Sequence, residues 1–202
     1  HSKLKSDMNT NIIISGVGGQ GILTIAAVLD TVALSEKLNV KQSEVHGMSQ
    51  RGGAVQSHVR ISDKPIHSDL IPEGKADMIL SVEPLESLRY LPYLKEDGWI
   101  ITDSETFENI RNYPEKELVF DRIKAYPNHK ILNATEEAKK LGNSKAANMI
   151  LLGAASTLLP IAGESFEKAI EKMFERKGER VVALNLEAFQ KGKALALNYT
   201  EV

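Results

Sequence analysis

The stretch "NIIISGVGGQGILTIAAVLDTVAL", residues 11–34, joins a β-branched apolar run, a glycine-rich turn and an apolar helical pattern. The run "NIIIS" predicts a buried strand. After Gly21, apolar residues recur at the helical period on one face. They are Ile22, Ile25, Ala26, Leu29 and Ala33. A strand that passes through glycines into a helix is typical of an α/β protein.

The turn itself fits the pattern G-x-G-x-x-G through Gly16, Gly18 and Gly21. Between a strand and a helix, this pattern can hold the diphosphate of a dinucleotide, and Glu44 would then bind the ribose. Alternatively, the glycines only permit close packing of the strand against the helix. A phosphate-binding P-loop is not supported, because Ile22 and Leu23 replace its Lys and Ser/Thr. Dinucleotide binding and close packing both stay open.

The rest of the chain alternates strands and helices. Apolar runs at 76–82, 99–103 and 129–134 predict strands, and the last third predicts helices at 145–159, 165–176 and about 181–197. Pro84 should begin a helix, and Thr135 should cap a short helix that stops at Gly142. We therefore expect a three-layer α/β/α fold with a mainly parallel sheet. Its central strands are Asn11–Ser15, Met78–Val82 and Trp99–Thr102.

One segment departs from this alternation. In "GAVQSHVRIS", residues 53–62, apolar and polar side chains alternate as in a half-exposed strand. "SDKP" then predicts a turn towards "IHS", residues 66–68. Residues 54–68 should therefore form an antiparallel hairpin at one edge of the sheet.

The composition is that of one ordinary globular domain. The chain has 202 residues, a net charge of −2 and no cysteine. The charge does not favour nucleic acid, and the apolar runs are too short to span a membrane. Without cysteine the chain offers no thiolate for zinc, for an iron–sulfur cluster or for nucleophilic catalysis. We expect a cytoplasmic protein with one domain over 9–202, preceded by a tag remnant or disordered segment at 1–8.

A second glycine-rich stretch, "EVHGMSQRGGAVQSHVR", covers residues 44–60. Polar side chains surround its glycines, and the set is Glu44, Gln50 and Arg51 with Gly47, Gly52 and Gly53. Arg51 can bind a carboxylate or phosphate through paired N–H groups. The alternative is an ordinary surface turn with a solvated arginine. The five histidines lack metal-ligand spacing, so we expect no metal site.

Several motifs together resemble one family over about residues 11–192. They are "GVGGQG", "EVHGMSQRGGAVQSHVRI", "GKADMILSVEPLESLRYLPYL", "NMILLGAAS" and "NLEAFQKG". The chain resembles the gamma subunit or domain of 2-oxoacid:ferredoxin oxidoreductases. Within that family, "RYLPYL" and "AANMILLGA" are most similar to the beta subunits of indolepyruvate:ferredoxin oxidoreductases.

The resemblance implies oxidative decarboxylation of a 2-oxoacid, with coenzyme A as co-substrate and ferredoxin as electron acceptor. Thiamine diphosphate, Mg²⁺ and iron–sulfur clusters would belong to a larger partner subunit, and this chain would be a non-redox subunit. It would be inactive alone, bind no cofactor by itself and form a homodimer when isolated. A stand-alone Rossmann-type nucleotide-binding module or NAD(P)-dependent dehydrogenase is the alternative.

Within this interpretation, two groups of residues are candidate site residues. Glu44, Gln50 and Arg51 would position the substrate or coenzyme. The residues expected to face the ligand or the partner subunit are Gly16, Gly18, Gly19, Gln20, Gly21, Gly47, Gly52 and Gly53.

Overall fold

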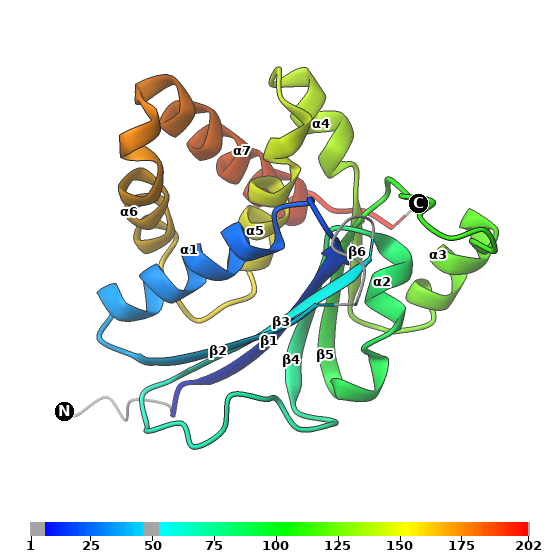
Figure 1. The fold of residues 1–202 in the computed structure, drawn as a ribbon, viewed down its shortest axis with the longest axis horizontal. Helices are drawn as coiled ribbons and strands as arrows, with labels where there is room; N and C mark the ends of the chain where they lie inside the picture. The colour runs from blue at the N-terminus through cyan, green and yellow to red at the C-terminus, as the bar shows by residue number, and fades with distance from the viewer. Residues whose placement is uncertain (1–6, 47–52, 202) are drawn as a thin grey trace.

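A computed structural model describes residues 7–46 and 53–201. Within this part, a six-stranded sheet has the order β2-β3-β1-β4-β5-β6 (Figure 1). The strands are β1 (Asn9–Val17), β2 (Asn39–His46), β3 (Ala54–Ser62), β4 (Ala76–Ser81), β5 (Leu94–Asp103) and β6 (His129–Leu132). The three predicted central strands are confirmed as parts of β1, β4 and β5.

The sheet is parallel from β1 through β4 and β5 to β6, and antiparallel at the β2–β3 edge. The predicted antiparallel edge is confirmed, but the predicted partner of residues 54–62 is wrong. β3 forms its hairpin with β2, where Val40 lies opposite Ile61, and residues 66–68 are not in a strand. β2 is an edge strand, and an edge strand needs few apolar side chains. Its polar sequence therefore does not indicate that it pairs with β3.

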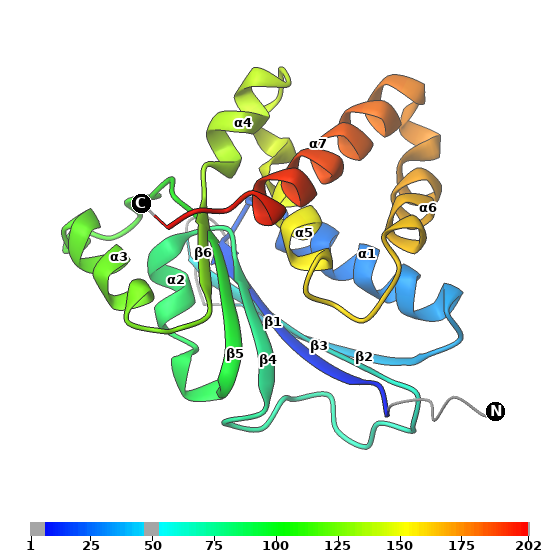
Figure 2. The same ribbon diagram turned by 180° about the vertical axis from the view of Figure 1, so that it is seen from behind.

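Helices cover both faces of the sheet, which confirms the three-layer arrangement. α1 and α5 lie over one face, with α4, α6 and α7 beyond them, and α2 and α3 lie over the other (Figures 1 and 2). The helices are α1 (Ile22–Ser35), α2 (Pro84–Leu88), α3 (Lys116–Lys124), α4 (Ala134–Lys140), α5 (Ala147–Ser156), α6 (Gly163–Phe174) and α7 (Glu179–Leu197). Among the described helices, none is both long and apolar enough to cross a membrane.

Each face of the sheet has its own hydrophobic core, because side chains alternate along each strand. Ile12 and Ile14 of β1 pack under α1 and α5, whereas Ile13 packs with residues of β4, β5 and α3. On the second face, the His58 ring accepts a hydrogen bond from the Ile71 N–H at 3.0 Å. This bond fixes the segment after β3 against the sheet.

α5 and α7 cross at backbone distance because each has a glycine at the crossing. A Cβ on Gly192 would lie 1.8 Å from the carbonyl oxygen of Ile150, and one on Gly153 would lie 2.0 Å from that of Phe189. Real Cβ contacts are never this short, so both positions require glycine unless the helices separate.

The end of α7 and the residues after it cover the outer edge of β6. The backbone N–H of Ile131 donates to the Tyr199 hydroxyl at 3.3 Å, and Lys130 Nζ donates to the Ala196 carbonyl at 3.1 Å. The same Nζ lies 4.8 Å from the centre of the Tyr199 ring. An edge amide that would otherwise be free to pair with another strand is thus occupied.

Candidate functional site

The glycine-rich turn between β1 and α1 requires glycine for its packing. Gly21 caps α1 with a left-handed backbone (φ 79°), and a Cβ there would lie 2.5 Å from the amide nitrogen of Asn148. A Cβ on Gly16 would lie 2.7 Å from the Ile22 side chain. The close-packing interpretation of the sequence therefore accounts for Gly21, whereas at Gly16 the ends of the Ile22 and Gln20 side chains would have to shift.

The two glycine-rich stretches meet in the fold. The N–H of Gly18 donates to the carbonyl oxygen of Gly53 at 3.0 Å. The side chain of Gln20 closes the first turn, because its oxygen accepts the N–H of Val17 at 2.7 Å. The other candidates in the second stretch lie outside the described residues. They are Gly47, Gln50, Arg51 and Gly52.

Glu44 lies on β2, opposite Ser57 of β3, and β3 separates it from β1. In a dinucleotide-binding fold, the strand with the ribose-binding acid neighbours the first strand. This strand order therefore gives no support to a ribose-binding role for Glu44. Its carboxylate accepts a hydrogen bond from the Gln42 amide at 2.7 Å. Burial, together with the Glu44 charge, raises the pKa of Asp30 on α1 to about 6.

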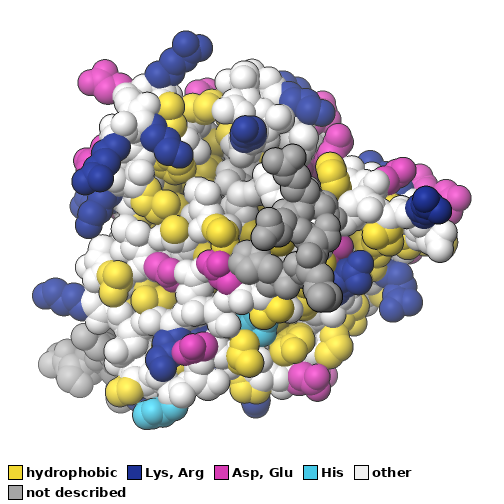
Figure 3. Space-filling view, viewed as in Figure 1, with side chains coloured by type: hydrophobic (Ala, Val, Ile, Leu, Met, Phe, Trp, Pro, Cys, Tyr) yellow, Lys and Arg dark blue, Asp and Glu magenta, His cyan; other side chains and the backbone are white. Residues whose placement is uncertain are grey.

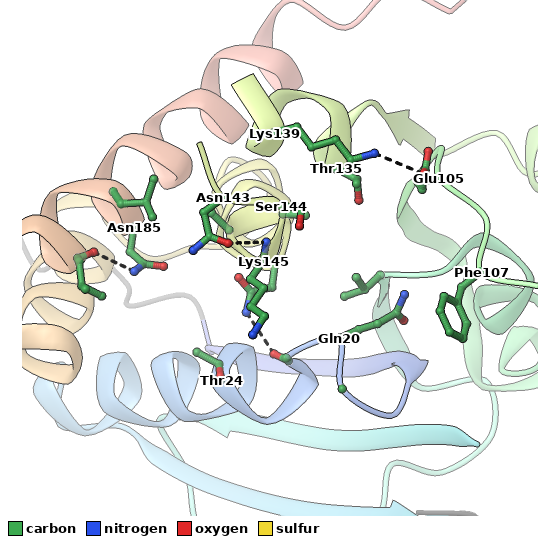
Figure 4. A pocket seen from close by; sticks show the side chains of 18 of the residues that line it. Gln20, Thr24, Glu105, Phe107, Thr135, Lys139, Asn143, Ser144, Lys145 and Asn185 are labelled. Carbon is green, nitrogen blue, oxygen red and sulfur yellow. Dashed lines mark hydrogen bonds and ion pairs between the residues drawn. The ribbon is translucent and has the colours of Figure 1, made fainter. Parts of the chain in front are cut away.

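A cleft of about 610 Å³ opens beside the glycine turn (Figure 4). Gly19, Gln20 and Gly21 form one side, at the start of α1. The opposite side consists of residues 143–148, which precede and begin α5, and of side chains from α7. Residues 105–107 and α4 close it on a third side. The cleft lies at the carboxyl end of β1, where open α/β sheets bind ligands.

The side chains around the cleft are cationic and rich in amides. Its lysines are Lys139, Lys145 and Lys177, and Glu105 is its one carboxylate among the described lining residues. Figure 4 shows Lys139 reaching from α4 towards Glu105, at a distance of 3.6 Å. Amides are presented by Gln20, Asn143, Asn148 and Asn185. Excess positive charge with amide groups and apolar lining side chains suits an organic anion with several polar groups.

Two buried carboxylates at the ends of β4 and β5 hold residues 104–113, which we call the wall segment. Glu83 is fully buried, and its Oε1 accepts the Phe107 N–H at 3.3 Å and the Tyr113 hydroxyl. Asp103 accepts the Glu105 N–H at 3.3 Å. Burial, reinforced by Glu83, raises the pKa of Tyr113, so its hydroxyl remains a donor. Glu105, Thr106 and Phe107 of this segment line the cleft.

Asp103 also holds the start of α4. Its Oδ2 accepts the Thr135 N–H at 3.1 Å and the Thr135 hydroxyl as well. Burial raises the pKa of Asp103, whereas the bond from the Thr135 hydroxyl opposes that rise. The predicted capping role of Thr135 is wrong, because its side chain bonds to β5 rather than to the first turn of its own helix.

Large apolar side chains lie exposed near this end of the sheet. Leu23 follows the glycine turn and is 46% exposed, and Phe107 of the wall segment is 48% exposed. Ile110 and Val45 are exposed as well. Figure 3 shows hydrophobic side chains at the surface around this part of the molecule. Exposed apolar side chains near a cleft are typical of protein–protein interfaces.

Sequence reasoning missed the residues that give the cleft its charge. Lys139, Lys145 and Lys177 lie on three different elements, and only the fold brings them together. A local signal exists in "GNSKAAN", residues 142–148, where small and polar residues precede a buried helix. In the described parts of the chain, no group of three or more His, Asp or Glu side chains is arranged to hold a metal ion.

Comparisons with known proteins show which family this chain belongs to. The family described as pyruvate ferredoxin/flavodoxin oxidoreductase matches residues 11–195. The chain therefore belongs to this family, and the resemblance found in the sequence is confirmed. It is 36% identical over 192 residues to the indolepyruvate oxidoreductase subunit IorB of Methanothermobacter thermautotrophicus. The matched region covers 92% of this chain and 96% of that protein.

Solved structures share the fold. The gamma subunit of a keto/oxoacid ferredoxin oxidoreductase from Geobacter sulfurreducens is 29% identical with a TM-score of 0.70, over 94% of this chain and 99% of that one. The 2-oxoglutarate:ferredoxin oxidoreductase from Magnetococcus marinus, solved with 2-oxoglutarate, coenzyme A and succinyl-CoA bound, is 23% identical with a TM-score of 0.79. That match covers 98% of this chain and 32% of that chain, so this fold is part of a larger polypeptide there.

Proposed function

We propose that this chain is the small, non-redox subunit of a 2-oxoacid:ferredoxin oxidoreductase that acts on indolepyruvate or another aryl pyruvate. The observation that carries this proposal is the family match over residues 11–195, together with a cationic cleft at the carboxyl end of the sheet. The IorB name of a 36% identical relative supports the aryl substrate. The strand order at β2 and β3 argues against the alternative, a stand-alone NAD(P)-dependent dehydrogenase.

The cofactors of this reaction do not fit the residues of this chain. Thiamine diphosphate needs a metal ion to anchor its diphosphate, and iron–sulfur clusters are held by cysteine thiolates. The chain has no cysteine, and its described residues hold no cluster of three acidic or histidine side chains. We therefore assign these groups to a larger partner subunit, which would also pass electrons to ferredoxin.

What remains for this chain is to bind and position coenzyme A, the acyl acceptor. The diphosphate and 3′-phosphate of coenzyme A are anionic, and Lys139, Lys145 and Lys177 supply the matching charge. The apolar side chains of Phe107 and Leu184 offer surface to the uncharged parts of the molecule. The relative from Magnetococcus marinus contains bound coenzyme A, which supports this choice of ligand.

The surface beside the cleft would bind the partner subunit. Leu23, Val45, Phe107 and Ile110 are exposed there and would be buried in a complex. Arg51 and Gln50 lie outside the described residues and keep the role predicted from the sequence: they would face the partner's active site and position an anionic group. Holding the coenzyme against the partner lowers the barrier mainly through proximity and orientation.

The test is titration of the purified chain with coenzyme A and, separately, with NADH, by calorimetry. We expect coenzyme A to bind and NADH not to bind. Lys145→Gln should weaken the binding of coenzyme A about 5- to 10-fold, because it removes one charge-assisted contact. Lys168→Gln is the matched control, because Lys168 on α6 pairs with exposed Glu164 at 2.8 Å and does not line the cleft. Binding of NADH but not of coenzyme A would refute the proposal.

A further inference from the structure

The wall segment connects β5, which ends at Asp103, to α3, which begins at Lys116. It contains no helix or strand, and yet Glu105, Thr106 and Phe107 within it line the cleft. A long irregular connection would move readily and would not form a fixed wall by itself. Something outside the segment must therefore hold it in place.

Glu83 supplies that support from the end of β4. It is 0% exposed, and its Oε1 accepts hydrogen bonds from two points of the wall segment: the Phe107 N–H at 3.3 Å and the Tyr113 hydroxyl at its end. Its Oε2 accepts the N–H of Glu86 at 2.9 Å, which fixes the carboxylate to the start of α2. One side chain thus joins the sheet, α2 and two points of the wall segment.

A carboxylate at position 83 can hold the wall segment because its two oxygens accept several hydrogen bonds. A fully buried carboxylate costs free energy unless hydrogen bonds replace its hydration. Both oxygens of Glu83 accept bonds, and two of the three donors come from the wall segment. An apolar side chain could fill the same volume, but it would leave the Phe107 amide and the Tyr113 hydroxyl without this acceptor.

Asp103 fixes the beginning of the same segment, since its carboxylate accepts the Glu105 N–H. Between this point and Tyr113, Glu83 accepts a hydrogen bond from the backbone of Phe107, a residue that lines the cleft. Figure 4 draws Phe107 among the side chains that line the cleft, together with Gln20 of the glycine turn. The position of this ring therefore depends on the bonds to Glu83.

We propose that Glu83 and Tyr113 are positioning residues for the cleft: together they hold the wall segment so that Phe107 and its neighbours contact the coenzyme. Neither side chain lines the cleft itself. Their effect on the ligand passes through the wall segment. This inference rests on the proposed binding of coenzyme A and adds the elements that shape its site.

Tyr113→Phe is the variant of choice, because it removes only the hydroxyl and keeps the ring packed. Tyr199→Phe is its matched control: it also removes a hydrogen-bonded hydroxyl, but beside β6. Glu83→Gln is a second variant, because the amide cannot accept bonds with both of its polar atoms. Each full-length protein is examined by amide hydrogen exchange without ligand and by calorimetry with coenzyme A.

We expect Tyr113→Phe and Glu83→Gln to speed amide exchange in residues 104–113 about 10-fold or more, and to weaken coenzyme A binding about 10-fold. Tyr199→Phe should change neither quantity. In the complete enzyme, Tyr113→Phe should raise the KM for coenzyme A and leave the KM for the 2-oxoacid unchanged.

The two measurements separate the possible failures. Unchanged exchange at 104–113 in Tyr113→Phe would overturn the inference whatever the ligand does. Faster exchange with unchanged affinity would overturn the positioning role. A wild-type chain that does not bind coenzyme A would refute the proposed function, and the exchange rates would still decide whether Glu83 and Tyr113 hold the segment.

Discussion

Replacing Gly192 with alanine tests the crossing of α5 and α7. The added Cβ would lie 1.8 Å from the Ile150 carbonyl oxygen and 2.6 Å from its carbonyl carbon. Both are backbone atoms of a helix, so no side chain can turn aside to make room. The two helices must separate by about 1 to 2 Å, and the core between them loses close packing.

The magnitude follows from two opposing effects. Overpacking of a core costs about 1–3 kcal/mol, and a clash between two backbones belongs at the upper end of that range or above it. Alanine in a helix regains about 1 kcal/mol relative to glycine. We expect the free energy of unfolding to fall by about 2–3 kcal/mol. In a chain of this length, that corresponds to a Tm lower by about 5–10 °C.

Urea unfolding followed by circular dichroism, together with calorimetry of the same samples, measures both quantities. Gly163→Ala is the control, because its Cβ would meet only the flexible end of Lys193, at 2.8 Å, and no backbone. That variant should stay within about 1 kcal/mol of wild type. A Gly192→Ala protein as stable as wild type would show that the helices do not depend on this contact.

Three further predictions concern charge. The folded pKa of Asp30 is about 6 against an ordinary 3.8, so wild-type stability falls as pH rises through this window. Asp30→Asn should raise the free energy of unfolding at pH 7.5 by about 1–2 kcal/mol, with allowance for partial exposure, but not at pH 3. Burial lowers the pKa of His58 below its ordinary 6.5, so the free energy of unfolding falls as pH drops below 6.5. His58→Gln should remove this pH dependence, as measured by urea unfolding at several pH values. In the reconstituted complex, Arg51→Ala should lower ferredoxin reduction about 30- to 1000-fold without loss of assembly, and unchanged kinetics would contradict its role.

The local sequence predicts the parts of the fold whose periodicity reflects burial. "NIIIS" and the helix after Gly21, which is α1, form as expected, since both contribute buried side chains to the core that they share with α5. The pairing of β2 is not predictable in this way. Its side chains are mostly polar, so the sequence does not indicate that it pairs with β3 and predicts a hairpin with residues 66–68 instead.

The candidate site is less predictable because its charge comes from separate elements. Gly19, Gln20 and Gly21 line the cleft, and their contact with a ligand or with the partner subunit stays a prediction. Lys139 and Lys177 are ordinary helix-end lysines in sequence, and nothing near them indicates a ligand. Glu83 resembles a surface residue before a proline, and only the return of the wall segment over β4 buries it.

The chain over the β6 edge limits how far copies of this protein can associate. With the Ile131 amide bonded to Tyr199, β2 is the remaining edge of the described sheet at which another strand can add. Two copies that pair through β2 by a twofold axis would each use up that edge. Growth would then stop at two, whereas a sheet with both edges open can extend into a fibre. Because the chain covers β6, the sheet cannot extend from both edges into a fibre.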